Sequence, residues 1–463
     1  FKVFKRLSRQ AYILESLEDT GRRGRYTFLG YDPKLCIDCK DGALNIKNGT
    51  TLTTRTDDPG ATIRQILEEN RTPRIAGLPP FTGGLVGYFS YDYIGYSEPA
   101  LGAVIRSEPD EEDFKDVDLM LFDKVIAYDH LERRVYLIVN IKTDFIEENY
   151  NRAAAELDHM ARLLLEGELA EMPPLALTSE MRLLFEKERY CDMVERARHY
   201  IKEGDIFQVV LSNRLDADAE GSLFDVYRML RRINPSPYMF YFSSDDLEIA
   251  GASPETLVKV KDGEAFTYPL AGTKPRGATP EEDAALEAEL LADPKERAEH
   301  NMLVDLGRND IGKIAAFGTV VVDKYMEIER YSHVMHIGST VQGELREDLA
   351  ATDAVDAVLP AGTLSGAPKI RACEIIAELE GNRRGVYGGA IGYLGFTGDM
   401  DTCIAIRIAY KKNGRVFVRA GAGIVYDSVP ETEFEECRNK AAAVVNALHQ
   451  ASQEAAFMYR GKE

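Results

Sequence analysis

The chain has 463 residues, of which 45% are hydrophobic and 29% are charged, as is typical of a globular protein long enough for more than one domain. Its formal net charge of −21 argues against a general nucleic-acid-binding protein, although a local basic pocket could still bind a small anion. No apolar run approaches the roughly 18 residues of a membrane span, and six scattered cysteines favour a reduced, cytoplasmic protein.

Strand patterns dominate the first part of the chain. Alternating apolar residues bounded by turn signals predict strands at 26–30, 35–38, 43–46 and 135–140. Apolar residues then recur at helical spacing over 145–166, and a segment ending in Pro173 and Pro174 follows. We interpret this segment as a linker between an N-terminal domain, 1–178, and a C-terminal domain, 179–463.

Cys36 and Cys39 form a C-x-x-C pair within a predicted strand. Positions three apart on a strand point to opposite faces of the sheet, whereas a redox pair favours the N-terminus of a helix. We therefore interpret both residues as structural cysteines rather than as a metal or redox site.

The second part of the chain mixes helices and strands without regular alternation. A helix at 187–203 precedes a strand at 207–212, and the last helix is expected near 432–451. Two consecutive helices, 280–292 and 294–306, each begin with a proline near the first turn. Mixed blocks of this kind favour the α+β class over a doubly wound parallel sheet.

Several motifs have an ordinary structural interpretation when each is taken alone. The glycine-rich segments 83–87, 388–392 and 421–423 lack the dinucleotide-binding fingerprint, and predict turns or strands with close backbone approach. His333 and His336 lie three apart in a predicted strand, so they face opposite ways and cannot share one metal ion.

Two pairs of acidic residues lie three positions apart on predicted helices: Glu296 with Glu299, and Glu433 with Glu436. Such acids usually form a solvated helix face. Two helices that converge could instead bind Mg²⁺, which prefers hard oxygen ligands. Spacing alone leaves both interpretations open.

Taken together, the motifs between Glu186 and Ala447 resemble the chorismate-utilising enzyme family. They lie in family order at 251–257, 269–277, 299–310, 359–369, 384–393, 419–425 and 431–441, and looser matches occur at 13–16 and 83–92. The resemblance implies an α+β fold in which large antiparallel sheets pack face to face with helices on the outside.

The resemblance also implies a magnesium-dependent site for chorismate, which is a dianion. Glu299 and Glu436 match the family's metal ligands, so Mg²⁺ is the expected cofactor. Arginine can form two hydrogen bonds to a carboxylate, and glycines let backbone N–H groups approach an anion. The positions that match the family's substrate contacts are Gly272, Thr273, Tyr387, Arg407, Gly421, Ala422 and Gly423.

Four positions match catalytic residues of the family. Glu255 matches the general acid that protonates the departing ring hydroxyl, which is a poor leaving group as hydroxide. His336 matches a histidine associated with the later loss of pyruvate. Gln208 and Thr363 are the other two catalytic positions.

Two positions favour one reaction within the family. Members that add water carry a lysine base where this chain has Gln208, which cannot deprotonate water, so ammonia is the expected nucleophile. Members that make aminodeoxychorismate carry a nucleophilic lysine where this chain has Ala271. We therefore expect ammonia to add directly to chorismate, and pyruvate loss to give anthranilate, the first step of tryptophan biosynthesis. The alternatives are an aminodeoxychorismate-forming subunit and a non-catalytic amino-acid-binding regulator with the same fold.

The resemblance further implies feedback inhibition by tryptophan, although 13–16 taken alone could equally be an ordinary strand end. No cysteine lies in a glycine-flanked nucleophile elbow, so a separate glutamine amidotransferase subunit should supply ammonia, in a hetero-oligomer that the resemblance implies to be a heterotetramer. The positions that match the family's tryptophan pocket are Leu14, Glu15, Ser16, Pro237, Tyr238 and Met239.

Overall fold

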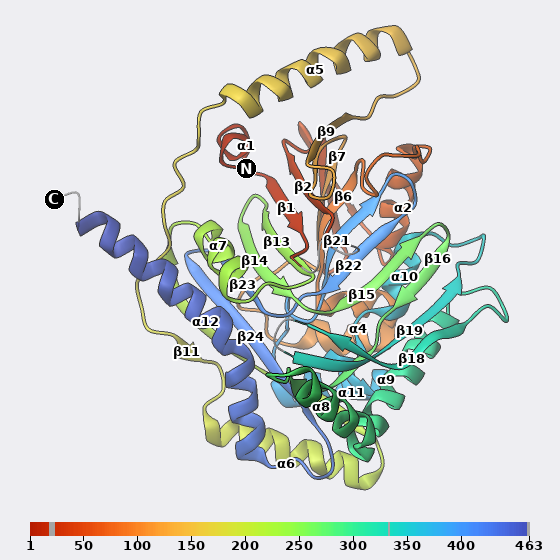
Figure 1. Ribbon diagram of the computed structural model, residues 1–463, viewed down its shortest axis with the longest axis vertical. Helices are drawn as coiled ribbons and strands as arrows, with labels where there is room; N and C mark the ends of the chain where they lie inside the picture. The colour runs from red at the N-terminus through yellow and green to blue at the C-terminus, as the bar shows by residue number, and fades with distance from the viewer. Residues whose placement is uncertain (18–23, 332–333, 461–463) are drawn as a thin grey trace.

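Two large antiparallel sheets form the centre of the molecule, and helices cover their outer faces (Figure 1). A computed structural model describes residues 1–17, 24–331 and 334–460 of the chain, with the side chains of the last helix described through 454. Each sheet has twelve strands within these residues. His333 lies outside the described residues.

The first sheet contains strands from both ends of the chain. Its β11 (Arg182–Leu183) and β20 (Gly366–Ala367) pair with β12 off the main path. The order along the main path is β10 (Ala176–Leu177), β12 (Gln208–Glu220), β24 (Arg415–Ile424), β23 (Ile408–Lys412), β14 (Leu247–Ser253), β13 (Tyr238–Ser243), β1 (Ala11–Glu15), β2 (Tyr26–Tyr31), β8 (Lys124–Asp129) and β9 (Arg134–Val139).

The second sheet also contains strands from both ends of the chain. Its β18 (Val321–Arg330) pairs with β19 off the main path. The order along that path is β17 (Leu270–Pro275), β19 (Val334–Glu344), β16 (Glu264–Thr267), β15 (Thr256–Lys261), β22 (Met400–Ile404), β21 (Ala390–Gly395), β6 (Gly84–Phe89), β7 (Val117–Phe122), β3 (Leu35–Lys40), β4 (Ala43–Asn48) and β5 (Thr50–Arg55).

Helices bury one face of each sheet against apolar cores. The outer face of the first sheet packs against α6 (Lys187–Glu203), α7 (Phe224–Ile233), α11 (Lys369–Glu380) and α12 (Pro430–Arg460). The outer face of the second sheet packs against α2 (Pro59–Glu69), α9 (Pro294–Gly312) and α10 (Ala351–Val358), with α8 (Pro280–Ala292) beside α9. The remaining helices are α1 (Lys2–Leu7), α3 (Ile94–Ser97), α4 (Pro99–Ser107), α5 (Ile146–Glu166) and the 3₁₀ turns η1 (Tyr91–Tyr93) and η2 (Gly362–Leu364).

A third apolar core lies between the two sheets and is rich in aromatic rings. Tyr12 and Phe240 contribute to it from the first sheet, and Tyr88 and Phe122 from the second. Large aromatic side chains bury much apolar area per residue, so this layer holds the sheets face to face. The predicted fold class and arrangement of sheets and helices are confirmed.

Most predicted elements are present, and the deviations have a physical cause. The helices predicted at 187–203 and 280–292 match α6 and α8. Helix α9 continues past Leu306 to Gly312, and within it Gly307 packs closely on the second sheet, where an added Cβ would lie 3.1 Å from a methyl group of Thr267. Cys36 and Cys39 face different cores on the two sides of β3, which confirms their structural interpretation.

The strands before residue 178 share both sheets with those after it. Strand β1 pairs with β13, and β6 pairs with β21. The segment around 178 lies between β10 and β11, which both pair with β12. The division of the chain into two domains at this point stays a prediction.

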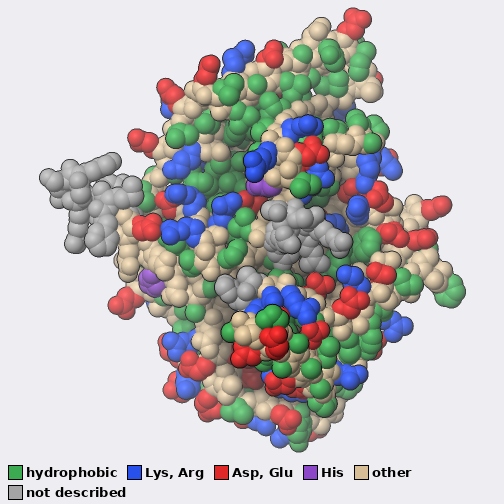
Figure 2. Space-filling model, viewed as in Figure 1, with side chains coloured by type: hydrophobic (Ala, Val, Ile, Leu, Met, Phe, Trp, Pro, Cys, Tyr) green, Lys and Arg blue, Asp and Glu red, His purple; other side chains and the backbone are tan. Residues whose placement is uncertain are grey.

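The helix α5 lies at one end of the molecule, near the edge strand β9 (Figure 1). Apolar side chains gather over this end of the face in Figure 2, and those of Phe145, Ile146, Leu164, Leu165 and Leu169 are exposed. Within the described residues, no helix is long and apolar enough to cross a membrane.

Candidate active site

The predicted general acid and the predicted substrate arginine lie where the chain passes from one sheet to the other. Glu255 lies between β14 of the first sheet and β15 of the second, and Arg407 lies in the return connection between β22 and β23. The two connections are hydrogen-bonded: the backbone N–H of Ile404 donates to the carbonyl of Glu255 at 3.0 Å, and that of Ala252 donates to the carbonyl of Arg407 at 3.2 Å. The general-acid position and the predicted substrate arginine are therefore fixed relative to each other.

The carboxyl group of Glu255 has an environment that favours its protonated form. Burial raises its pKa, and the hydroxyl of Thr363 and the charges of Lys440 and Arg407 offset only part of this effect. The Thr363 hydroxyl donates to the Oε2 atom of Glu255 at 3.1 Å and fixes its orientation. A carboxyl group with a raised pKa can retain a proton and donate it to a leaving group.

His336 lies on β19, next to two predicted substrate contacts on β17. Its Nδ1 atom lies 2.8 Å from the carbonyl oxygen of Gly272 and 3.1 Å from the hydroxyl of Thr273. Because a carbonyl only accepts, Nδ1 carries the hydrogen, which leaves Nε2 as the acceptor. Burial lowers the pKa of His336, so the ring is neutral near pH 7 and Nε2 can accept a proton.

The glycines of β24 leave room for two side chains that point to this strand. An added Cβ at Gly423 would lie 2.8 Å from the amide nitrogen of Gln208, and one at Gly421 would lie 3.1 Å from the hydroxyl of Tyr387. The Oε1 atom of Gln208 is buried and has no hydrogen-bond partner among the described residues. Ala422 points to the helix-covered core, so only its backbone can face a ligand.

The Arg407 side chain is exposed and, within the described part of the chain, makes no ion pair or hydrogen bond. Its charge acts on Glu255, since it contributes to lowering the pKa of that carboxyl group. An unpaired guanidinium beside a buried acid is available to bind a carboxylate with two parallel hydrogen bonds.

Acidic residues of α9 and α12 converge near this point. Burial, then the charge of Glu296 and, more weakly, that of Glu436 raise the pKa of Glu299. The ammonium of Lys440 lies 2.7 Å from Glu436 and is the nearby positive group on α12. The described residues contain no group of three or more side chains able to bind a metal ion. Carboxylates that repel one another across two helices nevertheless suit Mg²⁺, which uses one or two protein carboxylates and completes its coordination with water and substrate oxygens.

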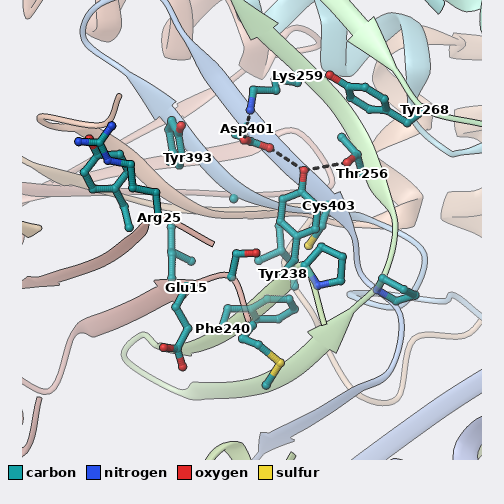
Figure 3. A pocket seen from close by; sticks show the side chains of 18 of the residues that line it. Glu15, Arg25, Tyr238, Phe240, Thr256, Lys259, Tyr268, Tyr393, Asp401 and Cys403 are labelled. Atoms are coloured by element: carbon teal, nitrogen blue, oxygen red, sulfur yellow. Dashed lines mark hydrogen bonds and ion pairs between the residues drawn. The ribbon is translucent and has the colours of Figure 1, made fainter. Parts of the chain in front are cut away.

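A separate cavity of about 300 Å³ lies between the two sheets (Figure 3). It is lined by β1 and β13 of the first sheet and by β15, β21 and β22 of the second. Antiparallel pairing places Leu14 opposite Phe240 and Glu15 opposite Met239, so two segments remote in sequence meet at one end of the cavity. All six residues of the predicted tryptophan pocket line it: Leu14, Glu15, Ser16, Pro237, Tyr238 and Met239.

The polar groups that line this cavity differ in whether they are free to form a hydrogen bond with a ligand. The hydroxyl of Ser16 is buried and has no hydrogen-bond partner among the described residues. The carboxylate of Glu15 points away from the cavity (Figure 3), toward Arg231, whose Nε atom donates to it at 2.7 Å. The hydroxyl of Tyr238 donates to Asp401 at 2.8 Å, and Asp401 also pairs with Lys259 at 2.9 Å.

Sequence reasoning missed part of the lining of this cavity. Asp401 and Tyr393 come from β22 and β21, and Arg25 lies just before β2. None belongs to a motif that the resemblance assigns to tryptophan binding. The available signal was a lone acid, Asp401, among the otherwise buried residues of β22, because an acid in such a strand requires a partner.

The comparisons with known proteins agree with this geometry. A family model described as chorismate binding enzyme matches residues 10–446. The chain belongs to the chorismate-binding enzyme family, as its motifs predict.

Two similar proteins share one printed name. The chain is 45% identical to "Anthranilate synthase component 1" of Acetivibrio thermocellus, covering 97% of this chain and 93% of that protein. It is 46% identical to the protein of the same name from Pseudomonas aeruginosa, covering 96% and 91%.

Solved structures show the same fold. Anthranilate synthase component I from Streptococcus pneumoniae superposes with a TM-score of 0.79 at 40% identity, covering 93% of each chain. The menaquinone-specific isochorismate synthase from Escherichia coli superposes with a TM-score of 0.70 at 20% identity, over 96% of this chain and 90% of that one, which supports the fold alone.

The raised pKa of Glu255 predicts a pH-dependent effect on stability. Because the carboxyl group of Glu255 binds its proton more tightly in the folded protein, the free energy of unfolding falls as the pH rises above the pKa of the unfolded state. This loss is complete once the pH exceeds the pKa of the folded state. Glu255→Gln should therefore raise the melting temperature more at about pH 8.5 than at about pH 5.5. The exposed Glu347 offers a control, since Glu347→Gln should show no such difference. A gain that is equal at both pH values would contradict the assigned environment of Glu255.

Proposed function

We propose that this chain is the chorismate-binding subunit of an anthranilate synthase, which aminates chorismate with ammonia and eliminates pyruvate to give anthranilate. The names of its relatives at 45% and 46% identity support this function. Two features of the geometry support it: the charge of Arg407 acts on both Glu255 and His336, and the side chains of Gln208 and Tyr387 lie against the glycines of β24.

The observation that carries the choice of nucleophile is the amide of Gln208. An amide cannot take a proton from water, whereas ammonia already has a nucleophilic lone pair. The buried Oε1 atom without a partner can accept a hydrogen bond from an incoming N–H group. Ala271, beside Gly272 on β17, offers no side-chain nucleophile, so direct amination is favoured over the aminodeoxychorismate route. The catalytic residues together also argue against a purely regulatory protein.

The reaction can be divided between two residues of the chain. The Glu255 carboxyl donates its proton to the ring hydroxyl, which leaves as water while ammonia adds beside the ring carboxylate. The Nε2 atom of His336, which is the acceptor nitrogen, then assists the proton removal that accompanies pyruvate loss and aromatisation. Arg407, Tyr387 and the backbone of β24 orient the anionic substrate.

A magnesium ion would be held by Glu299 and Glu436, where converging carboxylates raise the pKa of Glu299 in addition to burial. When bound, it supplies charge that neutralises the substrate carboxylate and polarises the ring. Lys440 pairs with Glu436 at 2.7 Å and adds positive charge beside these carboxylates.

Tryptophan is the proposed inhibitor, bound in the cavity of about 300 Å³ rather than at the catalytic residues. This volume lies at the lower end of the range for small-molecule sites. Ser16 provides a polar group for the ligand, and Tyr238, Phe240 and Tyr393 provide aromatic walls (Figure 3). A ligand in this cavity inhibits only if it favours an arrangement that binds chorismate less well.

The proposed partner is a glutamine amidotransferase subunit that delivers ammonia, in a heterotetramer. The naming of the relatives as component 1 supports a second component. All six cysteines are unpaired, and the thiols of Cys373 and Cys403 have pKa values raised by burial, which suits structural residues rather than a glutaminase nucleophile. Unpaired cysteines also support the proposed cytoplasmic location.

The nucleophile can be tested with the purified chain. Chorismate, Mg²⁺ and an ammonium salt should give fluorescent anthranilate, and glutamine should give none, because none of the six cysteines lies in a glycine-flanked nucleophile elbow. The rate should follow the concentration of free NH₃ as pH changes, since ammonium has no lone pair. Turnover with glutamine by the chain alone would contradict the proposal.

The metal ligands can be tested by replacing a charged ligand with its amide. Glu299→Gln and Glu436→Gln should each reduce turnover at ordinary Mg²⁺ concentrations by at least about 100-fold while the circular dichroism spectrum is unchanged. Glu435→Gln, at an exposed position of the same helix, is the matched control. Near-normal rates in both ligand variants would show that these glutamates do not bind the metal ion.

A variant of His336 tests whether this residue acts in pyruvate loss rather than in amination. His336→Met should slow pyruvate loss more than amination, so chromatography of quenched reactions should detect an aminated, non-aromatic intermediate. His449→Met, at an exposed position on α12, should accumulate none. If His336→Met leaves only unreacted chorismate, the histidine acts in the first step or in binding.

The regulatory pocket can be closed by a larger side chain. Ser16→Phe should fill the cavity and abolish inhibition by tryptophan while activity without tryptophan remains near normal. Thr178→Phe places the same side chain at an exposed position outside the cavity and should leave inhibition intact. Equal inhibition of Ser16→Phe and the parent would refute the pocket, but not the proposed reaction.

A further inference from the structure

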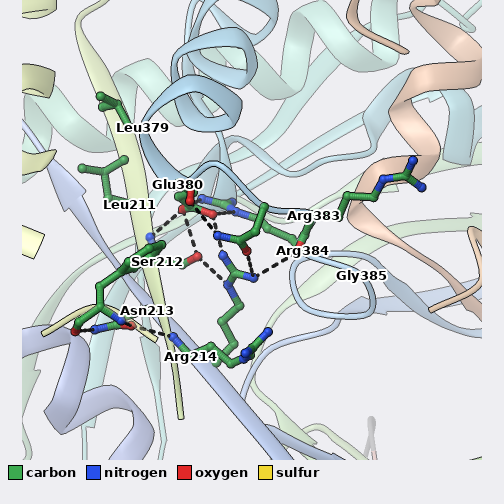
Figure 4. A network of polar contacts seen from close by, with 12 residues as sticks. Leu211, Ser212, Asn213, Arg214, Leu379, Glu380, Arg383, Arg384 and Gly385 are labelled. Carbon is green, nitrogen blue, oxygen red and sulfur yellow. Dashed lines mark hydrogen bonds and ion pairs between the residues drawn. The ribbon is translucent and has the colours of Figure 1, made fainter. Parts of the chain in front are cut away.

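Three charged side chains lie fully buried beside the proposed active site (Figure 4). The side chains of Glu380, Arg384 and Arg419 are 0%, 1% and 1% exposed. Glu380 is the last residue of α11, Arg384 lies in the loop that follows, and Arg419 lies on β24. None of the three belongs to the predicted catalytic, substrate or metal positions.

The carboxylate of Glu380 accepts five hydrogen bonds. The backbone N–H and hydroxyl of Ser212 donate to Oε1 at 2.8 and 2.9 Å, and Arg384 donates to Oε1 and Oε2 at 2.6 and 3.0 Å. Arg419 donates to Oε2 at 2.6 Å. Burial alone would raise the pKa of Glu380, but the two guanidinium groups and Ser212 hold it below its ordinary value. Glu380 is therefore ionised, and the buried cluster carries one excess positive charge.

Arg384 connects this cluster to the general acid and to the substrate wall. Its Nη1 atom donates to the carbonyl of Leu364 at 2.6 Å, and its Nη2 atom donates to the carbonyl of Val210 at 2.7 Å. Leu364 follows Thr363, the residue whose hydroxyl is bonded to Glu255. The guanidinium also lies 5.9 Å from the ring centre of Tyr387, within range of a cation–π contact.

Arg419 connects the same cluster to the glycines of β24. Its Nε atom donates to the hydroxyl of Ser212 at 2.7 Å, and Ser212 is paired with Gly421 in the sheet. Its Nη1 atom donates to the side-chain oxygen of Asn382 at 2.9 Å, in the loop that leads to Tyr387. One carboxylate thus holds together four segments that carry proposed active-site residues.

A contribution to folding stability does not by itself explain why three charged side chains are buried here. Taking three charges out of water is costly, and well-packed apolar side chains often stabilise a core equally well. Planar guanidinium groups, in contrast, fix the direction of several backbone and side-chain acceptors at once. The benefit of the cluster is therefore geometric precision beside reacting groups.

We propose that Glu380, Arg384 and Arg419 are positioning residues for the amination of chorismate, and that Arg384 acts through the 363–364 turn on the orientation of Glu255. This inference rests on the proposed function, because it assigns the first chemical step to Glu255. None of the three side chains is proposed to touch the substrate.

Arg384→Lys keeps the positive charge but loses the guanidinium fork that reaches two backbone carbonyls. We expect kcat with ammonia to fall by about 10- to 100-fold, with a much smaller change in KM for chorismate, because the acid is misoriented while Arg407 still binds. The matched control is Arg383→Lys, in the same loop. Arg383 is also buried, but its side chain pairs with Asp41 at 2.8 Å, away from the cluster. Its kcat should stay within about 3-fold of the parent.

A double-mutant cycle with Thr363 distinguishes an effect on the orientation of Glu255 from a general loss of stability. The quantity compared is kcat in the single and double variants. If Arg384 acts through Thr363, Thr363→Val already removes the bond to Glu255, so adding Arg384→Lys should reduce kcat little further. Multiplicative losses in the double variant would overturn the proposal. Equal kcat values for Arg384→Lys and Arg383→Lys, per folded molecule, would also overturn it.

A milder variant keeps the test decisive if Arg384→Lys does not fold. Ser212→Ala removes one hydroxyl shared by Glu380 and Arg419 and leaves both ion pairs in place, so it should fold and lower kcat by a few-fold. An unchanged kcat would count against the proposal.

The proposed function can fail independently of this inference. If the parent converts chorismate to a product other than anthranilate, the proposed function is wrong, but the same variants, assayed for that product, still test whether the cluster positions Glu255.

Discussion

The antiparallel pairing of β1 with β13, and of β6 with β21, is the constraint on which the rest of the structure depends. These two pairings join strands from the start of the chain to strands of its second half, so each sheet is continuous. The chain must then pass between the sheets, and the connections at Glu255 and Arg407 are two such passages. Both the proposed catalytic site and the large cavity arise from this one arrangement. A change of register in β1 would move Leu14 and Ser16 off the cavity and, through the shared sheet, disturb the strands that lead to the active site.

Electrostatics explains how a chain of net charge −21 can bind an anionic substrate. The proposed site concentrates positive groups: the exposed Arg407, Lys440 on α12, and the buried cluster with one excess positive charge beneath β24. Of the acids nearby, Glu255 and Glu299 are partly buried with a raised pKa, and Glu436 is paired with a cation. Each feature reduces the repulsion that a dianion would otherwise meet.

The sequence predicts the helices and the family motifs well, because helical periodicity and motif order are local properties of the chain. Through the resemblance, the sequence predicts six residues that line the large cavity. It does not predict Asp401 or Tyr393, because their positions depend on pairing with strands that are remote in the sequence. It could not predict the cluster of Glu380, Arg384 and Arg419. Charged residues on a helix end and a strand are ordinarily solvated, and only the packing of α11 against β12 and β24 buries them. Helix α9 extends beyond the predicted end at Leu306 and includes Gly307, although glycine is a weak helix former.

We expect chorismate to bind at the passage between the sheets and not in the large cavity, although that cavity has a greater volume than the pocket lined by Glu255 and Thr363. A crystal structure of the chain with chorismate and Mg²⁺, in the Glu255→Gln variant to slow turnover, tests this directly. We expect substrate density against Arg407 and Gly421, with a metal ion between the substrate and the carboxylates of Glu299 and Glu436. Substrate density beside Ser16 and Tyr238, with none near Arg407, would contradict it.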